Sequence, residues 1–147
     1  MEIAILGLGC FWGPEAKFSK LEGVIKTEVG YCGGDSKKTT YKEVCTGNTN
    51  HAEVVKLDFD PKIISYEKIL DFFFEIHDPT TLNSQGPDFG TQYRSEIFYL
   101  NDNQKGIAEN IIKKMNSNLS KKVVTKYSLS KNYCPAEEYH QRYLEKR

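Results

Sequence analysis

The sequence predicts a mixed α/β fold, and more specifically a two-layer ferredoxin-like plait with long loops and an extended C-terminal segment that ends in a short helix. Three observations support this expectation. Short apolar runs typical of strands alternate with amphipathic segments typical of helices. Their spacing fits two successive β-α-β units. The chain has 147 residues, the size of one domain, so we expect a single domain over residues 1–147.

The first predicted β-α-β unit occupies the N-terminal part of the chain. Residues 2–7 are a short apolar run that favours a buried strand, and a glycine-rich turn follows them. Pro14 suits the first turn of a helix, because its missing N–H has no helical partner there. We expect this helix to reach about Leu21, and the next two strands to cover residues 24–31 and 52–59.

The second unit begins with a helix that Ser65 is expected to cap. Apolar residues recur behind this cap at helical spacing, namely Tyr66, Ile69, Leu70 and Phe73. Residues 80–90 are rich in polar residues, Gly and Pro, which predicts a loop. Loops of this length are often functional. A strand is expected at residues 95–100.

Two more helices and a last strand complete the prediction. Asp102 is expected to cap a long helix, whose apolar face carries Ile107, Ala108, Ile111, Ile112, Met115 and Leu119. The last strand is expected at residues 123–127. A short helix from Pro135 would then present Ala136, Tyr139, His140 and Tyr143 on one face.

Composition excludes several classes of protein. The 20 basic and 20 acidic residues cancel, which removes the positive charge expected of a general nucleic-acid binder. Apolar residues make up 39% and aromatic residues 12%, too much for a disordered chain. The mean hydropathy of −0.55 and the lack of a long apolar run argue against a membrane span. No leader pattern opens the chain, so we expect a cytoplasmic protein.

The chain has four cysteines, too few for a disulfide scaffold: Cys10, Cys32, Cys45 and Cys134. No C-x-x-C pair occurs, which excludes a zinc ribbon and a thioredoxin-type motif. The three histidines are dispersed, and no Cys/His spacing indicates a metal site. We therefore expect reduced thiols and no bound metal.

Cys10 is the best candidate for a reactive thiol, because it lies between a predicted strand and a predicted helix start. Free N–H groups of the first helical turn and the helix dipole can lower a cysteine pKa there, and the thiolate is the reactive form. The alternative is a buried thiol that fills the corner between strand and helix. A dinucleotide fingerprint is disfavoured, since the glycine after Gly9 comes one position late, at Gly13. A cysteine phosphatase would need arginine where Ala16 stands.

The stretch Gly9-Cys10-Phe11-Trp12-Gly13 resembles the signature of the peptide methionine sulfoxide reductase A family. Further matching blocks follow in the same order, at residues 30–34, 41–45, 47–53, 72–79, 90–95 and 139–141. The resemblance runs from about Ile3 to about Leu144. It implies an enzyme that reduces methionine S-sulfoxide, free or in proteins, to methionine, and so repairs oxidative damage.

The resemblance also implies roles for particular residues. Cys10 would be the nucleophile that attacks the sulfoxide sulfur and becomes a sulfenic acid. Glu53 would be the acid, and a carboxyl that donates a proton near neutral pH needs a pKa raised by burial. Tyr41 and Tyr93 would donate hydrogen bonds to the sulfoxide oxygen.

Other residues would bind the substrate. Phe11 and Trp12 would form the walls that receive the S-methyl group, since aromatic rings make favourable contacts with sulfur and methyl groups. Asp88 would hold the substrate backbone or a water molecule. His140 would support the pocket from the last helix, while His51 is expected only to cap a turn near Glu53.

Regeneration of the nucleophile is the part that the resemblance leaves open. Many family members carry resolving cysteines in a glycine-rich tail, and this chain ends at Arg147 without one. We therefore expect an external thiol to reduce the enzyme: glutaredoxin with glutathione, thioredoxin or dithiothreitol. Cys134 or Cys32 could instead resolve the sulfenic acid, and Cys45 is expected to be structural.

The remaining expectations concern partners and the competing function. We expect a monomer without a cofactor, which acts on oxidised protein or free methionine sulfoxide and binds neither nucleic acid nor membrane. A more general thiol enzyme, such as a peroxidase or a thiol transferase, would use the same Cys10 turn. Only the reductase needs Glu53, Tyr41 and Tyr93 as well.

Overall fold

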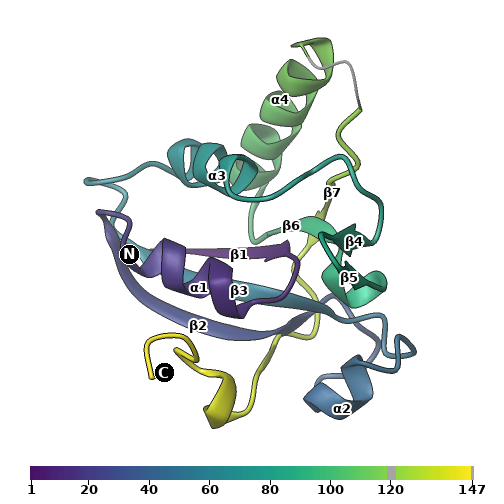
Figure 1. Cartoon of the computed structure of the whole chain (residues 1–147). Helices are drawn as coiled ribbons and strands as arrows, with labels where there is room; N and C mark the ends of the chain where they lie inside the picture. The colour runs from purple at the N-terminus through teal and green to yellow at the C-terminus, as the bar shows by residue number, and fades with distance from the viewer. Residues whose placement is uncertain (119–121, 147) are drawn as a thin grey trace.

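Six strands form the central sheet, in the order β7-β6-β1-β3-β2-β8 (Figure 1). This is a computed structural model, and it describes residues 1–118 and 122–146. The strands of the sheet are β1 (Glu2–Leu8), β2 (Val24–Cys32), β3 (Ala52–Phe59), β6 (Ser95–Tyr99), β7 (Lys126–Leu129) and β8 (Cys134–Pro135). All neighbouring strands are antiparallel except β6 and β7, which are parallel.

Helices connect these strands. They are α1 (Trp12–Ser19), α2 (Tyr41–Val44), α3 (Tyr66–Glu75) and α4 (Asp102–Asn118). Strands β4 (Ser84–Gln85) and β5 (Asp88–Phe89) form a small separate hairpin, and 3₁₀ turns cover Thr91–Tyr93 and Glu138–His140. The units β1-α1-β2 and β3-α3-β6 are the two β-α-β units that the spacing predicts.

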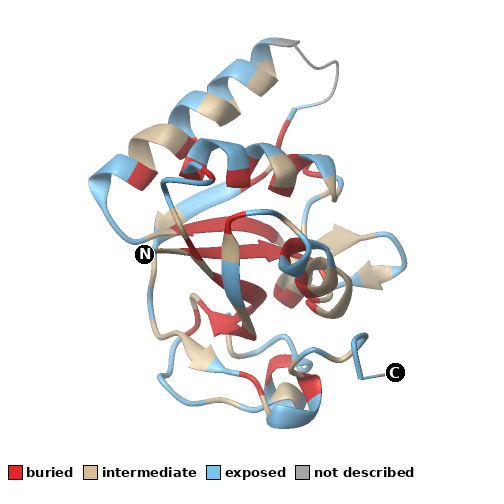
Figure 2. Ribbon diagram, turned by 90° about the vertical axis from the view of Figure 1, so that its left-hand side faces the viewer, coloured by how far each residue is buried: buried red, intermediate tan, exposed pale blue. Residues whose placement is uncertain are grey.

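Alternation along the strands gives the sheet two different faces. On one face, residues such as Leu6, Leu57 and Ile97 pack with Phe18 of α1 and Ile69 of α3. These strand residues are fully buried, as Figure 2 shows for much of the sheet. Because the three longer helices contribute to this cluster, we call it the helix face.

The opposite face, called the back face here, holds a smaller apolar cluster. Its buried members are Ile5, Cys32, Ala52, Val54 and Phe98, and Tyr133 packs against it. The backbone carbonyl of Lys131 accepts a hydrogen bond from the N–H of Gly33 at 2.8 Å. The segment 130–133 therefore crosses the back face between the edge strands β7 and β8.

The structure confirms the mixed α/β class, while the specific plait remains a prediction. Several boundaries differ from the expectation. α1 ends at Ser19 rather than near Leu21, and the predicted 80–90 loop contains the β4-β5 hairpin. The cap of α4 is Asn101, whose side chain accepts the Gln104 N–H, so Asp102 is the first helical residue. Leu119 lies outside the described residues.

The C-terminal predictions need two corrections. The last long strand begins at Lys126 rather than at residue 123, because the N–H groups of Val123 and Val124 bond to the Asn116 side chain and the Pro79 carbonyl. Pro135 does not begin a helix. It pairs with Gly30 as part of β8, and a single 3₁₀ turn follows. No helix among the described residues could span a membrane.

Candidate active site

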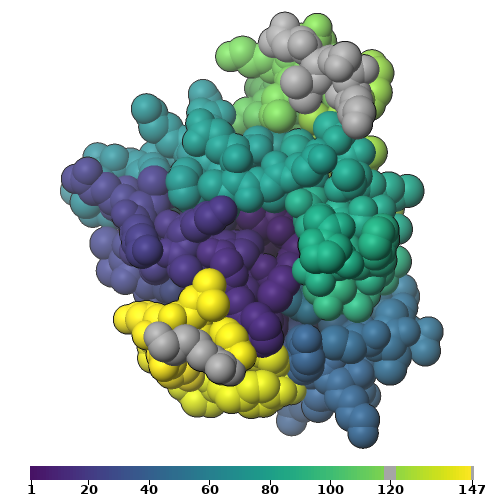
Figure 3. Space-filling view, in the orientation of Figure 1, coloured from purple at the N-terminus to yellow at the C-terminus, as the bar shows by residue number. Residues whose placement is uncertain are grey.

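A strained glycine turn presents Cys10 between β1 and α1. Gly9 has a φ of +99°, and a Cβ built on it would lie 2.9 Å from the Cβ of Gln85, so glycine is required for both reasons. Cys10 follows, half-buried. Figure 3 shows this N-terminal region, in purple, within a hollow bordered by the C-terminal segment and the teal region that contains the β4-β5 hairpin.

The pKa of Cys10 does not fit the expectation of a lowered value. Burial raises it to about 11, and the negative charge of Glu53 adds to this, while the backbone N–H of Trp12 lowers it. The helix begins only at Trp12, so its terminal N–H groups offset a part of the desolvation. At neutral pH Cys10 is thus a protonated thiol.

Glu53 lies beneath the Cys10 turn. Its side chain is 1% exposed, and Oε1 accepts a hydrogen bond from the N–H of Phe11 at 3.3 Å. Among the described residues Oε2 has no hydrogen-bond partner. Burial raises the pKa of Glu53 to about 8, and the charge of Asp88 adds to the effect. At neutral pH the carboxyl is therefore mostly protonated, as an acid requires.

The register of the sheet explains why Glu53 reaches this turn. Glu53 pairs with Tyr31 across β3 and β2, and it alternates with Val55 and Leu57, which belong to the helix face. A one-residue shift of β3 would move Glu53 to the back face. The strand pairing thus positions the Glu53 carboxyl beneath the Cys10 turn.

Tyr41 and Tyr93 come to the site from two short helical turns. Tyr41 opens α2, and Thr40 caps this helix by accepting the Glu43 N–H. The Tyr41 hydroxyl lies beside the Cys45 thiol. Tyr93 ends the 3₁₀ turn Thr91–Tyr93. Burial and the charge of Glu53 raise the pKa of both phenols, that of Tyr93 to about 12, so both remain proton donors.

Aromatic rings lie next to Cys10 in the chain and pack against the C-terminal segment. Phe11 is 1% exposed and packs against His140 with ring centroids 5.2 Å apart. The Trp12 indole stacks on Tyr143 at 3.8 Å, and its Nε1–H donates to Nδ1 of His140 at 3.1 Å. Burial lowers the pKa of His140, so this ring is neutral and its proton sits on Nε2, which has no partner among the described residues.

Asp88 lies on β5, half-buried, in the hairpin beside the Gly9 turn. Its negative charge raises the pKa of both Cys10 and Glu53. It therefore lies in the same electrostatic environment as Cys10 and Glu53, while its expected contact with the substrate stays a prediction.

The other cysteines lie in three different environments. Cys32 is fully buried on the back face, where its thiol donates to the Lys131 carbonyl, so the structure does not bring it to Cys10. Cys134 pairs with Tyr31 and is half-buried, with its thiol 3.8 Å from the Thr39 carbonyl. Cys45, expected to be structural, is instead exposed at the end of α2 beside Tyr41.

Two histidines have structural roles. His51 accepts the Gly34 N–H at Nδ1, and a Cβ on Gly34 would meet the imidazole at 2.2 Å, so His51 caps this turn as expected. His77 is held by the Phe73 carbonyl and the Ser95 hydroxyl, and burial lowers its pKa to about 4. In the described part of the chain, no three His, Cys, Asp or Glu side chains gather as metal ligands would.

The sequence analysis missed one residue of this region, Glu137. Its carboxylate accepts hydrogen bonds from the Tyr31 hydroxyl and from the backbone N–H of Tyr41. One of two adjacent glutamates within the helix predicted from Pro135 resembles a surface charge, and only the fold shows that β2 and α2 converge on it.

Comparisons with known proteins agree with this geometry. A sequence model of the family described as "Peptide methionine sulfoxide reductase" matches residues 2–147. A curated protein of Pelagibacter ubique, named peptide methionine sulfoxide reductase MsrA, is 88% identical over 147 residues and is covered completely, as is this chain. A protein of the same name from Pasteurella multocida is 52% identical, with 96% of this chain and 81% of that protein covered.

Solved structures are similar in fold. Reduced Mxr1 from Saccharomyces cerevisiae superposes with a TM-score of 0.93 at 42% identity, covering 99% of this chain and 85% of Mxr1. Mxr1 in complex with Trx2 gives a TM-score of 0.68 at 28% identity, covering 97% and 84%.

Proposed function

Because the chain belongs to the peptide methionine sulfoxide reductase family, we propose that it repairs oxidised methionine by reducing the S epimer of methionine sulfoxide, free or in proteins. In this proposal residues 1–147 act as a single catalytic domain. The substrate is oxidised protein or the free amino acid sulfoxide.

The proposed reaction begins with the attack of the Cys10 sulfur on the sulfoxide sulfur. As the new S–S bond forms, the sulfoxide oxygen gains negative charge and takes a proton from Glu53, while the thiol proton of Cys10 returns to the glutamate. The substrate S–O bond then breaks as the hydroxyl is transferred to the Cys10 sulfur, and the S–S bond breaks as the thioether leaves with that electron pair. Methionine has gained two electrons, and Cys10 has become a sulfenic acid.

One observation carries this proposal: the unpartnered Oε2 of a carboxyl that is protonated at neutral pH. Since Oε1 accepts the Phe11 N–H, the proton belongs on Oε2, for which no described residue provides an acceptor. A sulfoxide oxygen is such an acceptor. The Tyr41 hydroxyl lies beside the Cys45 thiol, a weak acceptor, so the sulfoxide oxygen would be the better acceptor for its proton.

The arrangement favours one configuration at sulfur. Phe11 and Trp12 would receive the methyl group, while Glu53 and the two tyrosines would bind the oxygen. Exchanging these two substituents would place the oxygen against an aromatic ring and leave the donors unpaired, at a cost of about 1–3 kcal/mol for each buried donor. Several such losses would exclude the R epimer.

The test is turnover of the separated sulfoxide epimers with dithiothreitol as reductant. The proposal expects methionine from the S epimer and almost none from the R epimer. Failure to reduce either epimer would refute the proposed function. Comparable rates on both would refute the proposed binding of the methyl group and the oxygen.

We further propose that an external thiol regenerates Cys10, through glutaredoxin with glutathione, a thioredoxin-type protein or dithiothreitol. Two thiols convert the sulfenic acid to thiol and water and form one disulfide. The yeast neighbour in complex with Trx2 supports a thioredoxin-type reductant. Cys32 lies across the sheet, which supports excluding it as a resolving group.

Counting thiols after one equivalent of substrate, without reductant, tests this route. The chain starts with four free cysteines. Loss of one thiol, with a sulfenic acid trapped at Cys10, is the expected result. Loss of two thiols would contradict it, and repeating the count in Cys134→Ser and in Cys45→Ser would identify the internal partner.

A further inference from the structure

Glu137 lies where three parts of the site meet. Its Oε1 accepts the Tyr31 hydroxyl at 2.8 Å, and its Oε2 accepts the backbone N–H of Tyr41 at 2.9 Å. Its own carbonyl accepts the N–H of His140 at 2.9 Å. One residue thus connects β2, the start of α2 and the 3₁₀ turn Glu138–His140.

Each of these connections leads to a group of the site. The ring of Tyr31 is fully buried and lies 5.8 Å from that of Phe11. Tyr41 carries a proposed donor to the sulfoxide oxygen, and its ring lies 4.4 Å from His140. His140 in turn accepts the indole N–H of Trp12.

The anchoring matters most for Tyr41. Helix α2 has only four residues, and a helix this short is not stable by itself. Thr40 satisfies the Glu43 N–H inside the turn, whereas the Glu137 carboxylate ties the first helical N–H to the rest of the molecule. Without this bond, α2 would be held by the buried Val44 side chain and by the contacts of the Tyr41 ring, and the start of the helix would lose its polar anchor.

We propose that Glu137 is a positioning residue of the reductase reaction, which fixes Tyr41 against the His140 turn through its two carboxylate hydrogen bonds. It does not contact the reacting atoms. The inference rests on the proposed function, because it assumes that Tyr41 donates to the sulfoxide oxygen.

The carboxylate remains charged in this position. Burial alone would raise the pKa of Glu137, but the hydrogen bonds from Tyr41 and Tyr31 and the proximity of His140 lower it below its usual value. Charged acceptors make stronger hydrogen bonds than neutral ones. A glutamine can still accept from the Tyr41 N–H and can donate to the Tyr31 oxygen, so the geometry should survive that substitution.

The experiment compares Glu137→Ala and Glu137→Gln with a matched control, Glu138→Ala. Glu138 is the next residue, and its side chain is exposed. A misplacement of about 1 Å can cost about 100-fold in rate, so we expect Glu137→Ala to lose about 10- to 100-fold in kcat/KM. The loss should fall mainly on kcat, because the bond from Tyr41 strengthens as charge develops on the oxygen. Glu137→Gln should stay within about threefold of the wild type, and the control should be unchanged.

Two further readouts separate positioning from a loss of fold. Trp12 is the only tryptophan, so its emission reports on the His140 turn, and it should shift in Glu137→Ala but not in Glu138→Ala. In a Tyr41→Phe background, Glu137→Ala should cost at most about threefold more in kcat, because residues that act through one another are not additive. If Glu137→Ala does not fold, Tyr31→Phe, which keeps the ring and removes one of the two bonds, should lower kcat in the same direction.

The inference is overturned if Glu137→Ala keeps kcat within threefold of the wild type, or if its loss is fully additive with Tyr41→Phe. It is also overturned if Glu137→Gln is as impaired as Glu137→Ala. Inactivity of the wild type on methionine sulfoxide would instead count against the proposed function, while the shift of Trp12 emission would still test the anchoring.

Discussion

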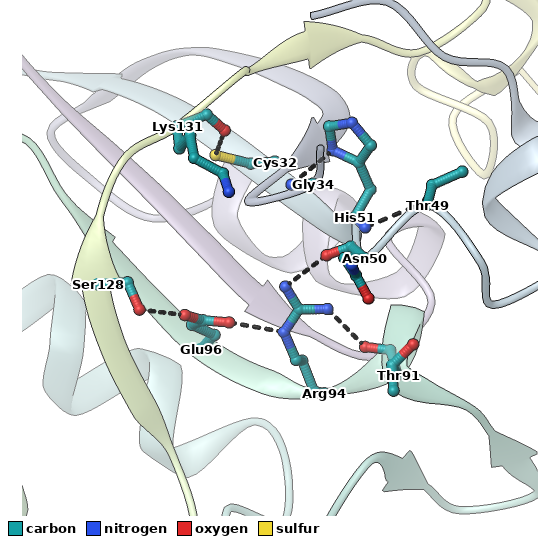
Figure 4. Close-up of polar contacts among 10 residues, drawn as sticks. All are labelled: Cys32, Gly34, Thr49, Asn50, His51, Thr91, Arg94, Glu96, Ser128 and Lys131. Carbon is teal, nitrogen blue, oxygen red and sulfur yellow. Dashed lines mark hydrogen bonds and ion pairs between the residues drawn. The ribbon is translucent and has the colours of Figure 1, made fainter. Parts of the chain in front are cut away.

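The region around Cys10 and the Arg94 network on the back face of the sheet treat their buried polar groups in opposite ways. On the back face, Figure 4 shows the Arg94 guanidinium bound to Glu96 at 2.6 Å and to the carbonyls of Thr91 and Asn50. Ser128 donates to the second oxygen of Glu96. Near Cys10, on the helix face, Glu53 Oε2 and His140 Nε2 are buried without a partner among the described residues.

This difference separates the scaffold from the site. A buried polar atom without a partner costs about 1–3 kcal/mol, so a fold keeps few of them. In the back-face network, as is usual for buried charges, each charged side chain is hydrogen-bonded or ion-paired with its neighbours. The groups near Cys10 leave hydrogen-bonding capacity unused, and a substrate with one polar oxygen can use it.

Cys10, in the site, and Cys32, on the back face, should respond very differently to substitution. Cys10→Ser should abolish turnover, by at least about 1000-fold in kcat/KM, because a serine hydroxyl is a far weaker nucleophile than sulfur near neutral pH. The measurement is methionine release from the S epimer with dithiothreitol. Activity above a small fraction of the wild type would remove Cys10 from its assigned role.

Substitution of the proposed acid, Glu53, should have the second largest effect on activity. Glu53→Gln removes the proton but keeps the shape, and loss of a general acid costs about 100- to 10,000-fold. Since Glu53 has a pKa of about 8, the advantage of the wild type over Glu53→Gln should shrink as pH rises through that value. Paired pH profiles of kcat/KM check this, and a constant ratio from pH 6 to 10 would contradict it.

Although Glu53→Gln should lower activity, it should raise stability relative to the wild type as pH rises. The unfolded chain loses the Glu53 proton above about pH 4.5, whereas the folded chain keeps it up to about pH 8. The wild type is therefore destabilised as pH rises through this window, and Glu53→Gln is not. Denaturant titrations should show the variant gaining on the order of 3 kcal/mol relative to the wild type between pH 5 and 8. A difference independent of pH would argue against a buried acid.

The smallest expected effect is that of a substitution on the back face. Cys32→Ala removes a buried thiol and its contacts with Ser130 and Lys131, which should cost about 1 kcal/mol of unfolding free energy. Turnover and regeneration by dithiothreitol should match the wild type. A selective loss of regeneration in Cys32→Ala would show that this thiol reaches the site after all.

Much of the fold follows from local patterns. The apolar spacing behind Ser65 predicts α3, and Ser65 caps it by accepting the Lys68 N–H. The C-terminal segment was harder, because Pro135 favours a helix start locally, while its partner Gly30 is distant in sequence. The conformation of this segment is set by its pairing with β2, and nothing in the local sequence indicates that pairing.

The same division holds for the site. A motif can name Cys10 and Glu53, but the pKa of each depends on burial by distant segments. The helix start suggested a lowered pKa for Cys10, and desolvation reversed it. For Glu53 the expected burial and the observed burial agree, and so does the direction of its pKa. The anchoring by Glu137 depends entirely on contacts between β2, α2 and the C-terminal turn.

In the proposed reaction, Glu53 holds a proton at neutral pH and offers it from an oxygen that has no partner among the described residues. Titration of the Glu53 side-chain carboxyl by ¹³C NMR, assigned through Glu53→Gln, tests it directly in the folded protein. The account predicts a midpoint near pH 8, with the carboxyl still mostly protonated at pH 7. A midpoint near the ordinary glutamate pKa of about 4.3 would contradict it, since the carboxylate would then have no proton to give.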